Sequence, residues 1–120
     1  DGGMTYHLSR LVGNKKAMQL LLLSELFSAQ EAKDWGLINQ LVEVENLEAA
    51  TLEIAQKIAS GPYESYQNIK QLLCASNQNS LTEQLAMEGK LFIKAAKTKD
   101  FATGVTAFIQ KRKPEFSEAN

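Results

Sequence analysis

The chain has 120 residues, 44% of them hydrophobic and 22% charged, which fits one domain or part of one and excludes an intrinsically disordered protein. Its net charge of −1, from 13 basic and 14 acidic residues, argues against nucleic acid or an anionic membrane as a partner. Cys74 is the only cysteine and His7 the only histidine, so an internal disulfide and a metal site rich in Cys or His are excluded.

The sequence also lacks membrane and secretion signals. The longest apolar run is Leu20–Leu23, far shorter than a membrane span, and the N-terminus is acidic and rich in glycine. We therefore expect no membrane partner and a cytoplasmic location, or a mitochondrial or peroxisomal matrix in a eukaryote. The chain begins at Asp1 without a methionine, from which we expect a longer parent protein.

Helical spacing of apolar residues dominates the first part of the chain. It predicts a helix that starts near Met4 and ends at Gly13, and a second over Lys15–Leu23. Ser28 and Glu31 have the spacing of a capping box, in which each side chain accepts a hydrogen bond from a backbone N–H of the other. They predict a short third helix that ends at Gly36, a residue suited to the left-handed conformation.

The spacing changes over Leu37–Val44, where apolar and β-branched residues are interrupted only by Asn39, Gln40 and Glu43. This pattern predicts a short strand. One strand cannot pair with itself, so either it pairs with a strand outside this sequence or the segment is not a strand.

Four further helices are predicted after the strand. The first follows Asn46 and ends at Gly61-Pro62, and the second ends before the polar loop Asn77–Asn79. A second capping box, Ser80 with Glu83, opens the third. The last begins at Thr98 or Asp100 and carries an apolar stripe of Phe101, Val105, Phe108 and Ile109. The sequence therefore predicts a mostly α chain of about seven helices and one short strand.

Three motifs carry a resemblance to a known family. The first is the segment from Asp1-Gly2-Gly3 to Leu-Val-Gly13, the second is Phe27-Ser-Ala-Gln-Glu-Ala-Lys-Asp-Trp-Gly-Leu-Ile38, and the third runs from Asp100-Phe-Ala-Thr-Gly to Lys-Arg-Lys-Pro-Glu-Phe116. In order and spacing they resemble the C-terminal half of crotonase-superfamily enzymes, the enoyl-CoA hydratase/isomerase group. Together the motifs are specific for the superfamily but not for the reaction.

The resemblance implies a fold and partners. The chain would be the C-terminal helical part of the crotonase (ClpP/crotonase) α/β fold. Residues 1–45 would form the end of the core, with helices lining the pocket, and residues 46–120 a helical trimerisation or lid region. An acyl-CoA thioester would be the substrate, with no separate cofactor and no metal. A homo-oligomer, either a trimer or a dimer of trimers, would be the assembly.

The resemblance also implies site residues. Asp1 matches the position where isomerase and dehalogenase branches carry a catalytic acid, although an N-cap aspartate without chemistry is an equal alternative. Lys111 matches a tail lysine near the CoA moiety, and Phe108 would pack near the acyl or adenine end. For Lys111, a solvated basic helix end is the favoured alternative. For His7, a surface or packed position is favoured over catalysis.

Two functions remain open at this stage. The first is a part of an acyl-CoA enzyme whose parent hydrates or isomerises enoyl-CoA through an enolate held in an oxyanion hole. The oxyanion hole and the hydratase carboxylates would then precede Asp1, and this chain alone would be inactive. The alternative is a non-catalytic helical module for oligomerisation or interaction.

Overall fold

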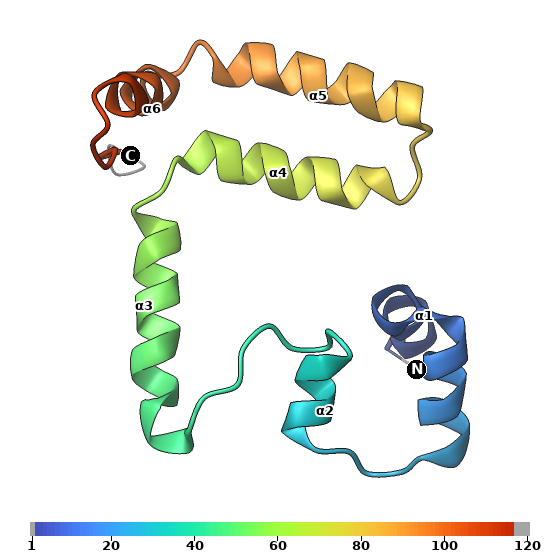
Figure 1. The fold of residues 1–120 in the computed structure, drawn as a ribbon. Helices are drawn as coiled ribbons and strands as arrows, with labels where there is room; N and C mark the ends of the chain where they lie inside the picture. The colour runs from blue at the N-terminus through green and yellow to red at the C-terminus, as the bar shows by residue number, and fades with distance from the viewer. Residues whose placement is uncertain (1, 117–120) are drawn as a thin grey trace. The chain divides into compact units, whose positions relative to one another are not determined.

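A computed structural model describes residues 2–116 of the chain. The chain divides into two compact units, with the boundary between Glu48 and Ala49. The boundary predicted between residues 45 and 46 lies close to this division, and the roles assigned to the two segments stay predictions. Figure 1 shows the helices in chain order.

The first unit begins with helix α1, Met4–Leu23, which is interrupted at Gly13. Gly13 has φ 78° and ψ 156°, a conformation that glycine adopts without the steric cost paid by other residues. The break therefore separates two consecutive helices, as the sequence predicted. Ser24 ends the second one in a left-handed conformation, with φ 51°, and its N–H donates to the carbonyl oxygen of Leu20.

Helix α2, Ala29–Asp34, has the predicted caps at both ends. The Ser28 hydroxyl accepts from the N–H of Glu31 at 3.2 Å, and the Glu31 carboxylate accepts from the N–H of Ser28 at 2.8 Å. Gly36 has φ 76°, and the N–H groups of Gly36 and Leu37 donate back into the last turn of α2. This pair of bonds is the Schellman arrangement that a left-handed glycine permits.

The strand predicted over Leu37–Val44 does not form in the described part of the chain. Residues 38–43 have no regular secondary structure there, and a 3₁₀ helix, η1 (Val44–Asn46), follows them. Helix α3, Leu47–Ala59, begins directly after η1. Asn46 ends η1 and directly precedes α3, so the helix starts after Asn46 as the sequence predicted. The physical reason for the missing strand is that residues 2–116 contain no second strand to receive its hydrogen bonds.

The second unit contains an antiparallel helical hairpin of α4 (Tyr63–Ser76) and α5 (Leu81–Ala95), which lie side by side in Figure 1. Its loop ends at the second capping box, in which the Ser80 hydroxyl accepts from the N–H of Glu83. At the opposite end, the Lys94 ammonium lies 2.9 Å from the Glu64 carboxylate. An ion pair this exposed adds little stability. The hairpin must therefore be held together by apolar contacts and by hydrogen bonds from side chains to the backbone.

Two amide side chains connect these helices. The Gln84 amide donates to the carbonyl oxygen of Leu72 at 3.2 Å, and the Asn68 amide approaches that of Leu91 at 3.5 Å. Asn68 is only 7% exposed, so its hydrogen bond offsets part of the cost of burying an amide.

Helix α6, Lys99–Ile109, completes the second unit. Thr98 is its N-cap and accepts from the N–H of Phe101 at 3.2 Å, which selects one of the two predicted starts. The Phe92 ring of α5 meets the Phe101 ring of α6 edge-on, with 5.9 Å between the ring centroids. Residues 2–116 thus contain six α-helices and one 3₁₀ helix, and the break in α1 accounts for the seventh predicted helix.

Very little apolar surface is buried within the chain. In the part of the chain that the structure describes, the buried hydrophobic residues are only Ala17, Ala32 and Ala107. Large apolar side chains on every long helix remain exposed, among them Leu22, Ile58, Leu73, Phe92 and Phe108. Since burial of such side chains is the main force that stabilises short helices, these helices require further apolar partners.

Candidate functional site

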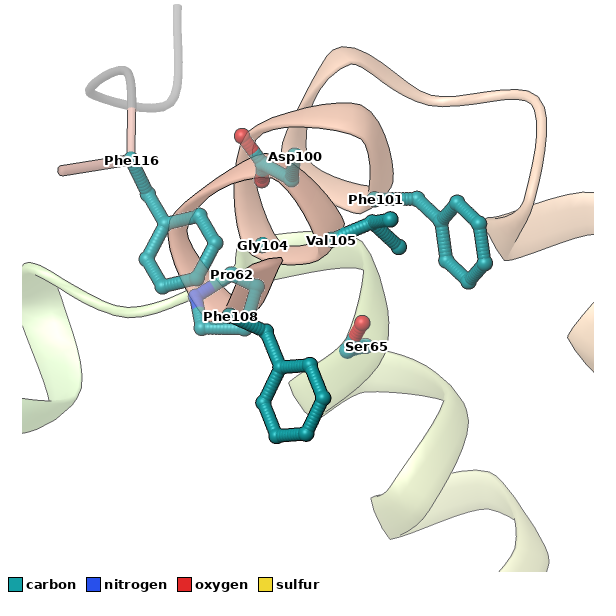
Figure 2. A pocket seen from close by; sticks show the side chains of 8 residues that line it. All are labelled: Pro62, Ser65, Asp100, Phe101, Gly104, Val105, Phe108 and Phe116. Carbon is teal, nitrogen blue, oxygen red and sulfur yellow. The ribbon is translucent and has the colours of Figure 1, made fainter. Parts of the chain in front are cut away.

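A hollow lies in the second unit, between α6 and the first turn of α4. Its volume is about 330 Å³, and Figure 2 shows its lining. Three aromatic rings and a proline contribute to it, so a ligand inside would contact a largely apolar wall. The lining residues are Pro62, Ser65, Asp100, Phe101, Gly104, Val105, Phe108 and Phe116.

Phe108 lies on this hollow, but most of its side chain faces solvent. It is 84% exposed, whereas Phe101 and Val105 on the same helix are 37% and 43% exposed. Figure 2 shows the Phe108 ring projecting from α6 and the Phe116 ring projecting from the segment that follows it. An aromatic side chain with this exposed fraction is available to a ligand or a partner surface.

Lys111 follows directly on the end of α6 and has an unusual backbone conformation. Its φ is 54°, in the left-handed region where a side chain crowds the carbonyl oxygen. The N–H of Lys111 donates to the carbonyl oxygen of Phe108, and the N–H of Arg112 donates to that of Ala107. These are the two bonds of a Schellman cap, with Lys111 at the position usually taken by glycine.

The basic side chains after α6 differ in their local contacts. The Arg112 guanidinium donates to the Gln110 side chain at 2.7 Å and to the carbonyl oxygen of Lys113 at 3.3 Å. Within residues 2–116, the Lys111 ammonium has no hydrogen-bond or ion-pair partner. The same holds for the Lys113 ammonium, whose residue contributes only its carbonyl oxygen to a bond, so Lys111 and Lys113 can each engage an incoming phosphate group without breaking an existing contact.

Asp1 lies outside the described residues, so its predicted role has no structural description. The turn after it is visible: Gly2 and Gly3 have φ values of 55° and 81°. Gly3 is the N-cap of α1 and has no side chain to cap the first N–H groups. The turn at Gly2 and Gly3 thus leads directly into the N-terminus of α1.

Arg10 and His7, in the first part of α1, make local contacts. The Arg10 guanidinium lies 3.5 Å from the centroid of the Tyr6 ring and donates to the carbonyl oxygen of Tyr6 at 3.0 Å. The His7 ring contacts the Tyr6 ring edge-on at 5.2 Å between centroids and lies against Gly3. These contacts give both side chains a packing role in the first turns of α1.

A smaller polar hollow of about 80 Å³ lies in the first unit. Its central contact places the Lys16 ammonium 3.7 Å above the Trp35 ring. The pKa of Glu31, which also lines it, is held below its usual value by hydrogen bonds from Ser28 and, to a smaller extent, by the charge of Lys16. The bonds between Ser28 and Glu31 cap the start of α2, and the Lys16–Trp35 contact links α1 to its end.

Phe108 lines the hollow and Lys111 does not, although the N–H of Lys111 donates to the carbonyl oxygen of Phe108 at the end of α6. The sequence did not identify Pro62, Ser65 and Phe116 as lining the hollow. The apolar stripe of α6 pointed to Phe101 and Val105, but no periodic pattern links them to α4. In residues 2–116 no set of three or more potential metal ligands converges, and no described helix combines the length and apolar character of a membrane span.

A profile of the enoyl-CoA hydratase/isomerase family matches residues 1–119. The chain belongs to this family. It is 36% identical over 117 residues to the 1,2-epoxyphenylacetyl-CoA isomerase of Escherichia coli K12, covering 98% of this chain and 45% of that protein. It is also 36% identical over 116 residues to the mitochondrial enoyl-CoA hydratase of Pongo abelii, covering 97% of this chain and 40% of that protein.

Solved structures agree with the family assignment. A putative enoyl-CoA hydratase/isomerase from Mycobacterium abscessus superposes with a TM-score of 0.92 at 27% identity, over 99% of this chain and 46% of that one. An enoyl-CoA hydratase from Bacillus anthracis superposes with a TM-score of 0.86 at 37% identity, over 95% and 44%. The chain therefore has the helical part of the crotonase fold. It spans less than half the length of these relatives.

Proposed function

We propose that this chain is the C-terminal part of an acyl-CoA enzyme that hydrates or isomerises enoyl-CoA thioesters. The observation that carries the proposal is the family match over residues 1–119 together with the 40–45% share of two full relatives that the chain spans. The exposed apolar faces of the helices support it, because a stable protein must cover such surface with further chain or with partner subunits. We expect the assembly to be a trimer or a dimer of trimers.

The proposed reaction passes through an enolate of the thioester. Peptide N–H groups outside this chain would stabilise the negative charge that develops on the thioester oxygen. Asp1 would then transfer a proton to or from the acyl chain, provided that the assembled pocket is apolar enough to raise its pKa. Because the oxyanion hole would lie outside residues 1–120, the chain alone would not turn over substrate.

Phe108 and Lys111 would contact the CoA moiety in this scheme. Phe108 offers an exposed ring for the adenine or the acyl chain, and Lys111 offers an unpaired ammonium for a phosphate. The two flank the end of α6, so one ligand can reach both. As the substrate supplies the CoA, no separate cofactor is required.

Activity assays on the full-length parent and on the 120-residue chain test the proposal. We expect the parent to hydrate or isomerise crotonyl-CoA or a longer enoyl-CoA, and the chain alone to be inactive. Asp1→Asn in the parent should lower isomerisation by roughly 10²–10⁴-fold, the usual contribution of a general acid–base, with CoA binding preserved. An unchanged rate would remove Asp1 from the mechanism, and turnover by the 120-residue chain would refute the placement of the oxyanion hole.

The alternative is a non-catalytic oligomerisation or interaction module, which the exposed apolar helix faces favour. It predicts self-association of the parent without binding of CoA thioesters. Isothermal titration of the parent with crotonyl-CoA separates the two functions, since only the enzyme would bind the thioester.

A further inference from the structure

The tail that follows α6, residues 110–116, folds back and ends against this helix. Pro114 and Phe116 are half-buried, whereas Glu115 between them is exposed. A methyl group placed on Gly104 would lie 3.8 Å from Cε1 and 4.0 Å from Cζ of the Phe116 ring. Figure 2 shows the same ring next to Pro62 at the wall of the hollow. The tail is therefore anchored on α6 by an aromatic ring.

The turn between α6 and this anchor holds Lys111 in a conformation that a lysine does not favour. Its φ is 54°, and such strain persists only where the surrounding structure fixes it. A Schellman cap commonly has an apolar contact between its last residue and the preceding helical turn. That last residue here is Arg112, whose guanidinium donates to Gln110 and Lys113 instead. The apolar contact for this cap therefore has to come from further along the tail.

The Phe116 ring is the apolar group that the tail supplies. Only residues 112–115 separate it from Lys111. Within this short connection, the ring of Pro114 fixes its own φ and restricts the residue before it to an extended conformation. Few backbone dihedrals are left free, so the position of the Phe116 ring limits the conformations open to Lys111. Release of the ring would allow Lys111 to leave the left-handed region and redirect its side chain.

We propose that Phe116 is a positioning residue for CoA binding, which holds the turn at Lys111 so that its ammonium is presented to a CoA phosphate. This inference rests on the proposed function, in which Lys111 contacts the CoA. Phe116 acts through the backbone of the tail and does not touch the phosphate. A turn that is already ordered loses less conformational entropy on binding. The effect therefore falls on KM and not on the chemical step.

Steady-state kinetics of the full-length parent with two thioesters test this role. Crotonyl-CoA carries the phosphates, and crotonyl-pantetheine lacks them. We expect Phe116→Ala to raise KM for crotonyl-CoA about fivefold, as loss of the exposed Lys111 ion pair would, with kcat unchanged. Both constants for crotonyl-pantetheine should equal those of the wild type. Phe116→Leu keeps an apolar anchor and should restore most of the lost affinity, and Glu115→Ala, on the exposed side of the tail, is the matched control.

Two further variants test whether Phe116 acts through Lys111. Pro114→Gly keeps the ring and loosens its connection to the turn. It should raise KM for crotonyl-CoA in the same direction, and it decides the question if Phe116→Ala does not fold. In a parent that already carries Lys111→Ala, Phe116→Ala should raise KM no further.

Three results would overturn the proposal. The first is a wild-type KM for crotonyl-CoA in Phe116→Ala, or in Pro114→Gly where Phe116→Ala does not fold. The second is an equal rise in KM for crotonyl-pantetheine, which would show a general structural role. The third is a further fivefold rise when Phe116→Ala is added to Lys111→Ala, which would show that Phe116 acts independently of Lys111.

These outcomes are separable from failure of the proposed function. A wild-type parent that neither binds nor converts enoyl-CoA would refute the function itself. A wild-type parent that is active, together with a Phe116→Ala variant of unchanged KM, would refute only the positioning role and leave the function intact.

Discussion

Substitution of Lys111 separates a structural role from a role in CoA binding. The wild-type residue has φ 54°, which costs a residue with a Cβ about 1–2 kcal/mol. Lys111→Gly removes this cost, but it also adds about 0.4–1 kcal/mol of conformational entropy to the unfolded chain. The expected net effect is a gain in the free energy of unfolding of about 0.5–1 kcal/mol, or roughly 1–4 °C in the melting temperature of the parent.

The matched control is Lys111→Ala, which removes the charge and retains the strained conformation. If Lys111 contacts a CoA phosphate, both variants lose the same exposed ion pair, worth about 1 kcal/mol, and KM for the enoyl-CoA should rise about fivefold with little change in kcat. Only Lys111→Gly should be more stable than the wild type. Thermal unfolding and steady-state kinetics of the parent measure the two effects.

Two results would refute this reasoning. A less stable Lys111→Gly variant would show that Lys111 does not occupy the left-handed cap in the assembled protein. An unchanged KM in both variants would remove Lys111 from CoA binding, and the residue would then be a solvated helix end.

Three further predictions concern stability and are measured on the parent by thermal unfolding. Ser24→Gly should raise the melting temperature because Ser24 has φ 51°, with Ser24→Ala, which keeps the strain, as the control. Gly61→Ala should lower the melting temperature, since its Cβ would overlap the Tyr66 ring. In the double variant, Tyr66→Ala should remove this overlap, so the two losses of stability should not add. Additive losses would contradict the predicted overlap. Bonds from the Ser80 hydroxyl and N–H hold the pKa of Glu83 below its ordinary value of 4.5. The stability that this box confers is therefore complete above that value and is lost as the pH falls through the lowered pKa. Glu83→Gln should reduce this loss, and an identical pH profile would refute the contribution of the cap.

The local sequence predicted the helices well because their ends depend on neighbouring residues. Both capping boxes require only a Ser and a Glu three residues apart, and both form as predicted. Gly36 and Gly13 likewise mark helix ends because only the local backbone has to adopt a positive φ. The C-cap at Lys111 was not predicted, since lysine carries no signal for a left-handed conformation.

The candidate site was predictable only in part. The motifs pointed to Asp1, Phe108 and Lys111, and the structure describes the surroundings of the last two. Pro62 and Ser65 reach the same hollow as Phe108 from α4, far away in the sequence. The spacing of apolar residues along one helix does not indicate which turn of another helix packs against it.

The sequence by itself determined the helices, their caps and the family, since capping, apolar spacing and motif order are properties of short segments. Tertiary structure decided which faces meet: the α4–α5 hairpin and the hollow beside α6. It also decided that residues 38–43 are not a strand within residues 2–116, although their composition favours one. A strand needs a partner for its peptide groups, and this requirement depends on polypeptide that is distant in sequence rather than on the segment itself.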